Sequence, residues 1–290
     1  NGPAPLSSSD GEGRGVRPPL LCRQKLALPH ALHVTPSGRD AIALALDGVR
    51  PDGEVWITSS VGTALHRLSP CVAQAVSRRA RVADRPSDRT VGVVVVHEWG
   101  FPHPERDGIV ELARQHRWRV VDDCAHAFQH GLDLAQGGAT VAFSLPKFLP
   151  VASGGLLANP SPLDTQRSFA LSPGAREAAI ADLLRQIPAR CAAHVANWQR
   201  LDALASARGW SSIDRLTAGV VPQVYRLRIE RQLGAQSAAA ELGVETTPPF
   251  YTGWLALPCH ADLPTPYWER IERWFQQVKF GLRLALGTNG

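Results

Sequence analysis

Short apolar runs alternate with amphipathic stretches over the first half of the chain, and this pattern predicts strands separated by helices. The runs that suit strands cover 54–57, 91–96, 118–121, 140–144 and 155–158, and the clearest helical spacing between them covers 107–116. Strands that are apolar throughout and separated by helices are typical of a parallel sheet covered on both faces. We therefore expect an α/β core over about residues 31–165.

The pattern is different on either side of this core. Residues 1–30 show little periodicity and are expected to form a flexible arm. After the core, the pattern predicts one or two long helices over 174–208, broken near Pro188, and then a strand at 220–230, a short helix at 233–243, a loop at 247–259 and an amphipathic helix at 265–285. Residues 166–290 should thus form a smaller α+β domain.

Composition narrows the class of protein. No apolar run approaches the roughly 20 residues of a membrane-spanning helix, so we expect no membrane partner. The net charge is +5, but the basic residues are scattered without a basic and aromatic patch, which argues against nucleic acid. The 5 cysteines lack a CxxC pair or regular spacing, so we expect neither a disulfide framework nor a metal site, and a reducing cytoplasm fits best.

A pair of acids follows one of the expected strands. Val120-Val121 leads directly into Asp122-Asp123, and Cys124-Ala125-His126 comes next. Open α/β sheets bind ligands at the carboxyl ends of their strands, so the two carboxylates stand where a ligand would lie. The plainer alternative is that they only cap the following helix.

Lysine is rare in this chain, because only Lys25, Lys147 and Lys279 occur among 31 basic residues. Lys147 stands among apolar neighbours just past a strand end, and Gly154-Gly155 follows it. Apolar surroundings lower the pKa of an amine, and a desolvated lysine is a nucleophile for carbonyl compounds. A surface lysine directed to solvent is the usual alternative.

A possible phosphate site lies at the start of the first expected helix. Ser37 is a plausible N-cap, and Gly38-Arg39 follow it. Backbone N–H groups at a helix start suit a phosphate, although many helices begin in this way. No Walker loop or GxGxxG segment supports nucleotide binding.

Together these segments resemble the DegT/DnrJ/EryC1/StrS aminotransferases, a family of fold type I enzymes that depend on pyridoxal phosphate. The helix start Ser37-Gly38-Arg39 is similar to that family's SGR/SGT segment, and Val120–Ala127 is similar to its VIEDAAHA segment. Phe143-Ser144, Lys147 and Gly154-Gly155 match its FSF–K–GGEGG segment, and Val94–Pro102 resembles VVHLYGQP. The resemblance covers about residues 33–275 and implies a large, mostly parallel pyridoxal-phosphate-binding domain with a smaller C-terminal α+β domain.

The resemblance also implies a role for each matched residue. Lys147 would form the Schiff base with the cofactor and move the proton, and Asp123 would keep the pyridine nitrogen protonated. His126 would stack beside the ring or hydrogen-bond its phenolic oxygen. Ser37, the backbone of Gly38-Arg39 and Ser144 would hold the phosphate, while Asp122 needs no catalytic role.

The function implied is transfer of an amino group from a donor to a keto group, of a keto-sugar or a similar polar ketone, by a homodimer. The stretch Ser59–Thr63 lacks the aromatic that usually stacks on the cofactor, which leaves a regulatory or degenerate cofactor-binding protein as an alternative. A sugar dehydratase would have His in place of Lys147, and a binding protein without the cofactor remains a further alternative. Arg226 and Arg228 could pair with a substrate carboxylate, but an exposed strand face explains them as well.

Overall fold

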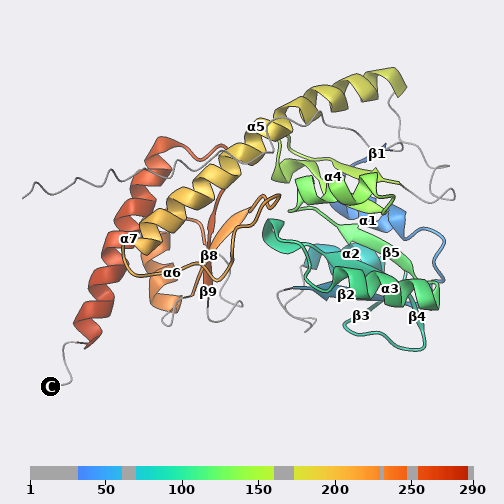
Figure 1. Cartoon of the computed structure of the whole chain (residues 1–290), viewed down its shortest axis with the longest axis horizontal. Helices are drawn as coiled ribbons and strands as arrows, with labels where there is room; N and C mark the ends of the chain where they lie inside the picture. The colour runs from blue at the N-terminus through green and yellow to red at the C-terminus, as the bar shows by residue number, and fades with distance from the viewer. Residues whose placement is uncertain (1–31, 61–69, 160–172, 229–231, 247–253, 287–290) are drawn as a thin grey trace, which may run out of the picture.

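A computed structural model describes residues 32–60, 70–159, 173–228, 232–246 and 254–286, and it contains a large and a small sheet (Figure 1). The large sheet has 7 strands in the order β1-β7-β6-β5-β4-β2-β3. Its strands are β1 (Leu32–Thr35), β2 (Glu54–Ser59), β3 (Arg81–Ala83), β4 (Thr90–Val96), β5 (Arg119–Asp123), β6 (Val141–Ser144) and β7 (Gly155–Ala158). Neighbours from β3 to β6 run parallel, whereas β7 is antiparallel to β6 and β1. The expected α/β fold with a mostly parallel sheet is confirmed.

Helices cover both faces of this sheet because its strands are apolar on both sides. Val94 and Val96 of β4 share a core cluster with α1 (Gly38–Ala45) and α2 (Pro70–Ser77). The alternate residues Val93 and Val95 pack with α3 (Arg106–His116), and α4 (Phe128–Gln136) packs against β6 and β7 on that same side. The faces of β5 differ in the same way, since Val121 lies toward α1 and Val120 toward α3.

The small sheet pairs β8 (Val224–Arg228) with β9 (Trp254–Pro258) in antiparallel register. It packs against α6 (Gln232–Glu241) and α7 (Thr265–Leu286), with Trp274 and Phe275 of α7 fully buried in its core. The small α+β layer that the pattern after residue 173 predicts is therefore present.

One long helix joins the two layers. Helix α5 (Pro173–Ser206) packs Leu184, Ile187 and Cys191 into the core of the large sheet and Trp198, Leu201 and Ala205 into that of the small one. Figure 1 shows it as a continuous ribbon along both layers. The predicted break near Pro188 is wrong, because the helix continues through this proline. A proline removes one backbone hydrogen bond, and burial of apolar side chains on both sides of it offsets that loss.

Some elements were not expected from the sequence. They are the strands β1, β3 and β9 and the helices α2 and α4, and β3 has only 3 residues. The expected loop at 247–259 contains β9, while 247–253 and the expected arm at 1–30 lie outside the described residues. No helix within the described ranges has both the length and the apolar character needed to cross a membrane.

A buried ion pair fixes the end of β5 on the α3 side. Asp122 is fully buried, and both of its oxygens accept hydrogen bonds from Arg106 of α3, at 2.7 and 2.8 Å. Burial raises the pKa of Asp122, but the hydrogen bonds from Arg106 and His97 outweigh it, so this pKa lies below its ordinary value. His97 Nδ1 accepts the N–H of His103, so its Nε2 donates to Asp122 at 3.0 Å. These contacts tie Asp122 to the residues that hold the end of β5 in place.

We predict that Arg106→Met lowers the free energy of unfolding by roughly 3 kcal/mol at pH 7, because it leaves the buried Asp122 carboxylate without its cation. Urea unfolding followed by circular dichroism measures this value. The control is Arg114→Met, which removes an exposed ion pair with Glu111 and should change little. Equal small losses for both variants would contradict the structural role of Asp122.

Candidate active site

The carboxyl ends of β4, β5 and β6 meet at one edge of the large sheet, because these strands are parallel. Asp123 ends β5, Ser144 ends β6, and Lys147 follows in the short 3₁₀ helix η4 (Leu145–Lys147). The start of α1 reaches the same edge, since Ser37 forms an isolated bridge with Gly154. The sheet therefore gathers the residues that the sequence motifs single out.

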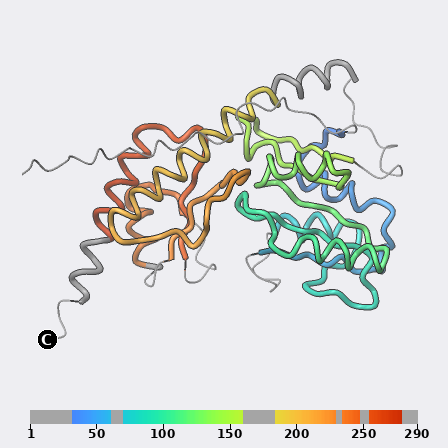
Figure 2. Tube along the Cα trace, viewed as in Figure 1, coloured from blue at the N-terminus to red at the C-terminus, as the bar shows by residue number. Residues whose placement is uncertain are grey.

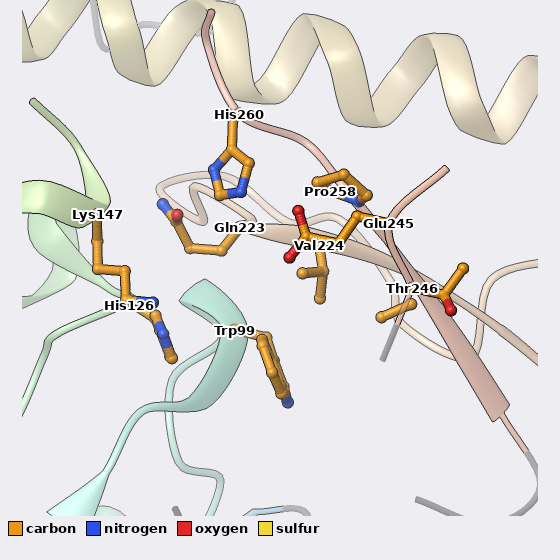
Figure 3. A pocket seen from close by; sticks show the side chains of 10 residues that line it. Trp99, His126, Lys147, Gln223, Val224, Glu245, Thr246, Pro258 and His260 are labelled. Carbon is orange, nitrogen blue, oxygen red and sulfur yellow. The ribbon is translucent and has the colours of Figure 1, made fainter. Parts of the chain in front are cut away.

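A cavity of about 150 Å³ lies between this edge and the small sheet. From the large sheet's side it is lined by Trp99, His126 and Lys147, and from the small sheet's side by Gln223, Glu245 and His260 (Figure 3). Of the expected site residues, the cavity thus brings together Lys147 and His126. Asp123, Ser144 and the start of α1 lie along the same edge without lining this cavity.

The environment of Lys147 is more exposed than the apolar one that the sequence predicts. Its chain neighbours Leu145 and Phe148 are buried, but the Lys147 side chain itself is exposed and extends into the cavity, near His126. The reason is that a 3₁₀ turn directs successive side chains to different sides. Lys147 has no hydrogen bond or ion pair to any described residue, so its amine is accessible to a ligand.

His126 lies flat against an aromatic ring. The His126 and Trp99 rings are stacked, with centroids 5.2 Å apart and planes 5° from parallel. Burial, with smaller contributions from the nearby Lys147 and His260, lowers the pKa of His126 to about 3. His126 is therefore neutral at physiological pH and offers one donor and one acceptor nitrogen.

Asp123 faces away from Arg106, because successive strand residues point to opposite faces. It is only 4% exposed, and the one hydrogen bond that its carboxyl group makes within the described residues is from the N–H of Ala125 at 3.0 Å. Burial raises the pKa of Asp123 to about 6. A buried carboxyl without a cation suits a ligand that brings a positive N–H group.

The start of α1 fits closely against β6 and β7. A Cβ at Gly155 would lie 2.5 Å from the carbonyl carbon of Ser37, so a glycine is required there. A Cβ at Gly38 would lie 3.0 Å from that of Ser144, which places the Ser144 side chain beside the first helical turn. This juxtaposition of a hydroxyl and helix N-terminal N–H groups suits a phosphate.

Two side chains of the helix start have other partners. Ser37 Oγ donates to the Asp40 carboxylate at 2.6 Å and accepts from the Asp40 N–H, so it caps the helix. The Arg39 guanidinium donates to Gln74 of α2 at 2.8 Å. At this helix start, the backbone groups rather than these two side chains are placed to meet an anion.

Sequence reasoning matched the turn after β4 to a family segment but gave its residues no role in the site. Trp99 has φ 59° and Gly100 has φ 94°, and a Cβ at Gly100 would lie 2.1 Å from the Val221 carbonyl oxygen. The Trp99 carbonyl accepts the Gln223 N–H at 2.8 Å, which joins this turn to the chain entering β8. The tube trace brings the two segments together midway between the layers (Figure 2). The signal in the sequence was the Trp99-Gly100 pair, which follows the apolar strand after two polar residues.

Glu98 in this turn was also not expected. It is 4% exposed, and its Oε2 has no hydrogen-bond partner within the described residues. Burial raises the pKa of Glu98 to about 7, although the Ser59 hydroxyl and the Arg226 guanidinium favour its charged form. Glu98 and Asp123 interact electrostatically, so this edge holds two carboxyls with raised pKa values.

Arg226 and Arg228 do not share an exposed face. Arg226 is largely buried in an ion pair with Asp214, and its guanidinium lies 5.2 Å from the Trp254 ring centroid. Arg228 is exposed at the end of β8. Because Arg226 already has a carboxylate partner, it is not poised to bind a second one.

We predict that the titration of Glu98 makes the free energy of unfolding fall as the pH rises. Its folded pKa is raised, so its contribution is complete below the ordinary pKa of 4.5 and is lost as pH rises through about 7. Glu98→Gln removes this titration, and its free energy of unfolding relative to wild type should rise by about 3 kcal/mol between pH 4.5 and pH 8. Urea unfolding at both pH values tests this, and a pH-independent difference would contradict it.

No protein-family model matches the sequence, and no curated protein matches it either. Solved structures do match the fold. TlmJ, an aminotransferase from Streptoalloteichus hindustanus, has a TM-score of 0.69 at 21% identity, over 88% of this chain and 87% of that one. DesV from S. venezuelae, solved with a ketimine intermediate, has a TM-score of 0.68 at 19% identity, over 88% and 86%.

A DegT DnrJ EryC1 StrS aminotransferase from Brucella abortus matches with a TM-score of 0.64 at 13% identity, over 87% of this chain and 86% of that one. At such identities the likeness concerns the fold. Over most of its length, this chain therefore has the fold of the DegT/DnrJ/EryC1/StrS aminotransferases, which is fold type I of the pyridoxal-phosphate enzymes.

Proposed function

We propose that this protein is a pyridoxal-phosphate-dependent aminotransferase that moves an amino group to the keto group of a keto-sugar or a similar polar ketone. The observation that carries the proposal is Asp123, a buried carboxyl with no cation bound to it among the described residues, at the sheet edge that also holds Lys147. The fold shared with aminotransferases supports it, and NtdA from Bacillus subtilis, one of the structures with this fold, is described with bound cofactor PMP.

The residues present fit this cofactor. Asp123 would hold the pyridine nitrogen, and Ser144 with the first turn of α1 would hold the phosphate. Lys147 would bind the aldehyde carbon, and neutral His126 would contact the ring or its phenolic oxygen. When bound, the cofactor supplies a carbonyl that links to amines and a cationic ring that accepts electrons.

In this proposal, the overall reaction exchanges an amino group for a carbonyl oxygen. The donor amine becomes a carbonyl compound, and the acceptor ketone becomes an amine, so no external oxidant or reductant is needed. Lys147, whose side chain lines the cavity, would carry the proton to and from the reacting carbon. Asp123 would keep the ring nitrogen protonated throughout.

We predict that Lys147 is the point of covalent attachment. Incubation with pyridoxal phosphate followed by borohydride should add one stable label, mapped by mass spectrometry to the peptide that contains Lys147. Lys147→Arg keeps the positive charge but cannot form the linkage, so it should take up no label while its circular dichroism stays native. Lys279→Arg is the matched control and should label fully. A label on another residue in the wild-type protein would refute the assignment.

We predict that Asp123→Asn retains the cofactor but slows amino transfer by about 10- to 100-fold, because a charge-assisted hydrogen bond contributes roughly 1.5–3 kcal/mol. Stopped-flow spectra of the first half-reaction, with an amino donor in excess, measure the rate. The control Asp133→Asn alters an exposed acid on α4 and should leave the rate unchanged. A wild-type rate for Asp123→Asn would remove this acid from the chemistry. If the label forms on Lys147 but no ketone is aminated, the protein is the cofactor-binding alternative without transferase activity.

A further inference from the structure

We infer that Gln223 is the residue that selects a hydroxylated ketone, by hydrogen-bonding a hydroxyl next to the reacting carbonyl. This rests on the proposed function and adds a specificity-determining residue to it. Gln223 immediately precedes β8 and lines the cavity on the side opposite Lys147. Figure 3 shows its amide directed toward Lys147 and His260.

The Gln223 side chain is buried without a partner. The residue is 2% exposed, and neither Oε1 nor Nε2 has a hydrogen bond within the described residues. Buried polar groups in native proteins are almost always hydrogen-bonded, and a group that lacks a partner costs stability. An amide retained in this state at a cavity wall is therefore explained by a ligand that satisfies it.

Two hydrogen bonds fix the backbone of Gln223, one to each layer. The Gln223 N–H donates to the Trp99 carbonyl of the large layer at 2.8 Å, and the Gln223 carbonyl accepts the Cys259 N–H after β9 at 2.9 Å. Val221 also packs against Gly100, whose positive φ and lack of a Cβ allow this contact. Both layers thus fix the backbone position from which the Gln223 side chain extends, as a specificity residue needs.

The chemistry of the cavity favours a hydroxyl as the ligand. An amide offers an acceptor oxygen next to two N–H donors, which complements a hydroxyl because a hydroxyl both donates and accepts. A carboxylate only accepts and prefers arginine, but none of the described lining residues is arginine, and Glu245 adds a negative charge. Thr246 and the Trp99 ring, which also line the cavity, suit a polar, hydroxylated molecule.

The test uses the cofactor-loaded protein in its amine form and three small ketones: dihydroxyacetone, hydroxyacetone and acetone. Single-turnover rate constants give the preference for the hydroxylated ketones over acetone. Gln223→Met has nearly the same shape but no hydrogen-bonding groups, and we expect the preference to fall about 10- to 100-fold relative to wild type. The same ketones are used with both proteins, so the intrinsic reactivity of each ketone cancels when the preference of the variant is divided by that of wild type. Gln223→Asn keeps the amide on a shorter stem and should show an intermediate preference.

A second readout separates a specificity role from a structural one. Since the Gln223 amide has no partner without the ketone, Gln223→Met should unfold at the same or a higher urea concentration than wild type. The exposed Gln115→Met on α3 is the matched control and should change neither the preference nor the urea midpoint. A lower midpoint for Gln223→Met would show that the amide is structural, which overturns the inference.

An unchanged preference in Gln223→Met, while wild type aminates hydroxylated ketones, overturns the inference but leaves the proposed function intact. If wild type aminates none of the ketones and none of a set of nucleotide keto-sugars, the proposed function fails and the inference fails with it. The two failures are therefore distinguishable by the behaviour of the wild-type protein.

Discussion

The site depends on the alternation of side chains at the end of β5. Asp122 and Asp123 are adjacent in the chain, yet they point to opposite faces of the sheet. Asp122 is neutralised by Arg106, which fixes the strand to α3, and it also accepts a hydrogen bond from His97. Among the described residues, the Asp123 carboxyl receives only a backbone N–H, and burial raises its pKa, which suits the cationic partner that we propose. One carboxylate thus stabilises the edge on which the other is free to act.

The second constraint is the connection between the two layers. Helix α5 contributes side chains to both cores, and the Trp99–Gln223 hydrogen bond joins the turn after β4 to the entrance of β8. The cavity lies at this connection, so residues from both layers line it. A displacement of either layer would therefore change the distance between Lys147 and Gln223, which links the rigidity of the fold to the proposed selectivity.

The sequence predicted the fold class and the approximate positions of several strands, because these depend on local pattern. The apolar runs predicted β2, β4, β5, β6 and β7. The motifs singled out Asp123, Ser144 and Lys147, which lie at one edge of the large sheet. It could not predict the exposure of Lys147, because the turn of η4 and the polar cavity wall arise from tertiary packing. Glu98, Trp99 and Gln223 were missed for a similar reason, since a single polar or aromatic residue near a strand end gives no periodic signal. The continuity of α5 through Pro188 likewise depends on two cores that lie far apart in the sequence.

The central claim is that Asp123 is a buried acid prepared for a protonated pyridine nitrogen. The most direct measurement is the ¹⁵N NMR chemical shift of the ring nitrogen, in protein loaded with ¹⁵N-labelled pyridoxal phosphate. The account predicts the shift of a protonated pyridinium in the wild-type protein at neutral pH and that of a neutral pyridine in Asp123→Asn. A neutral nitrogen in the wild-type protein, or the same shift in both proteins, would contradict the account.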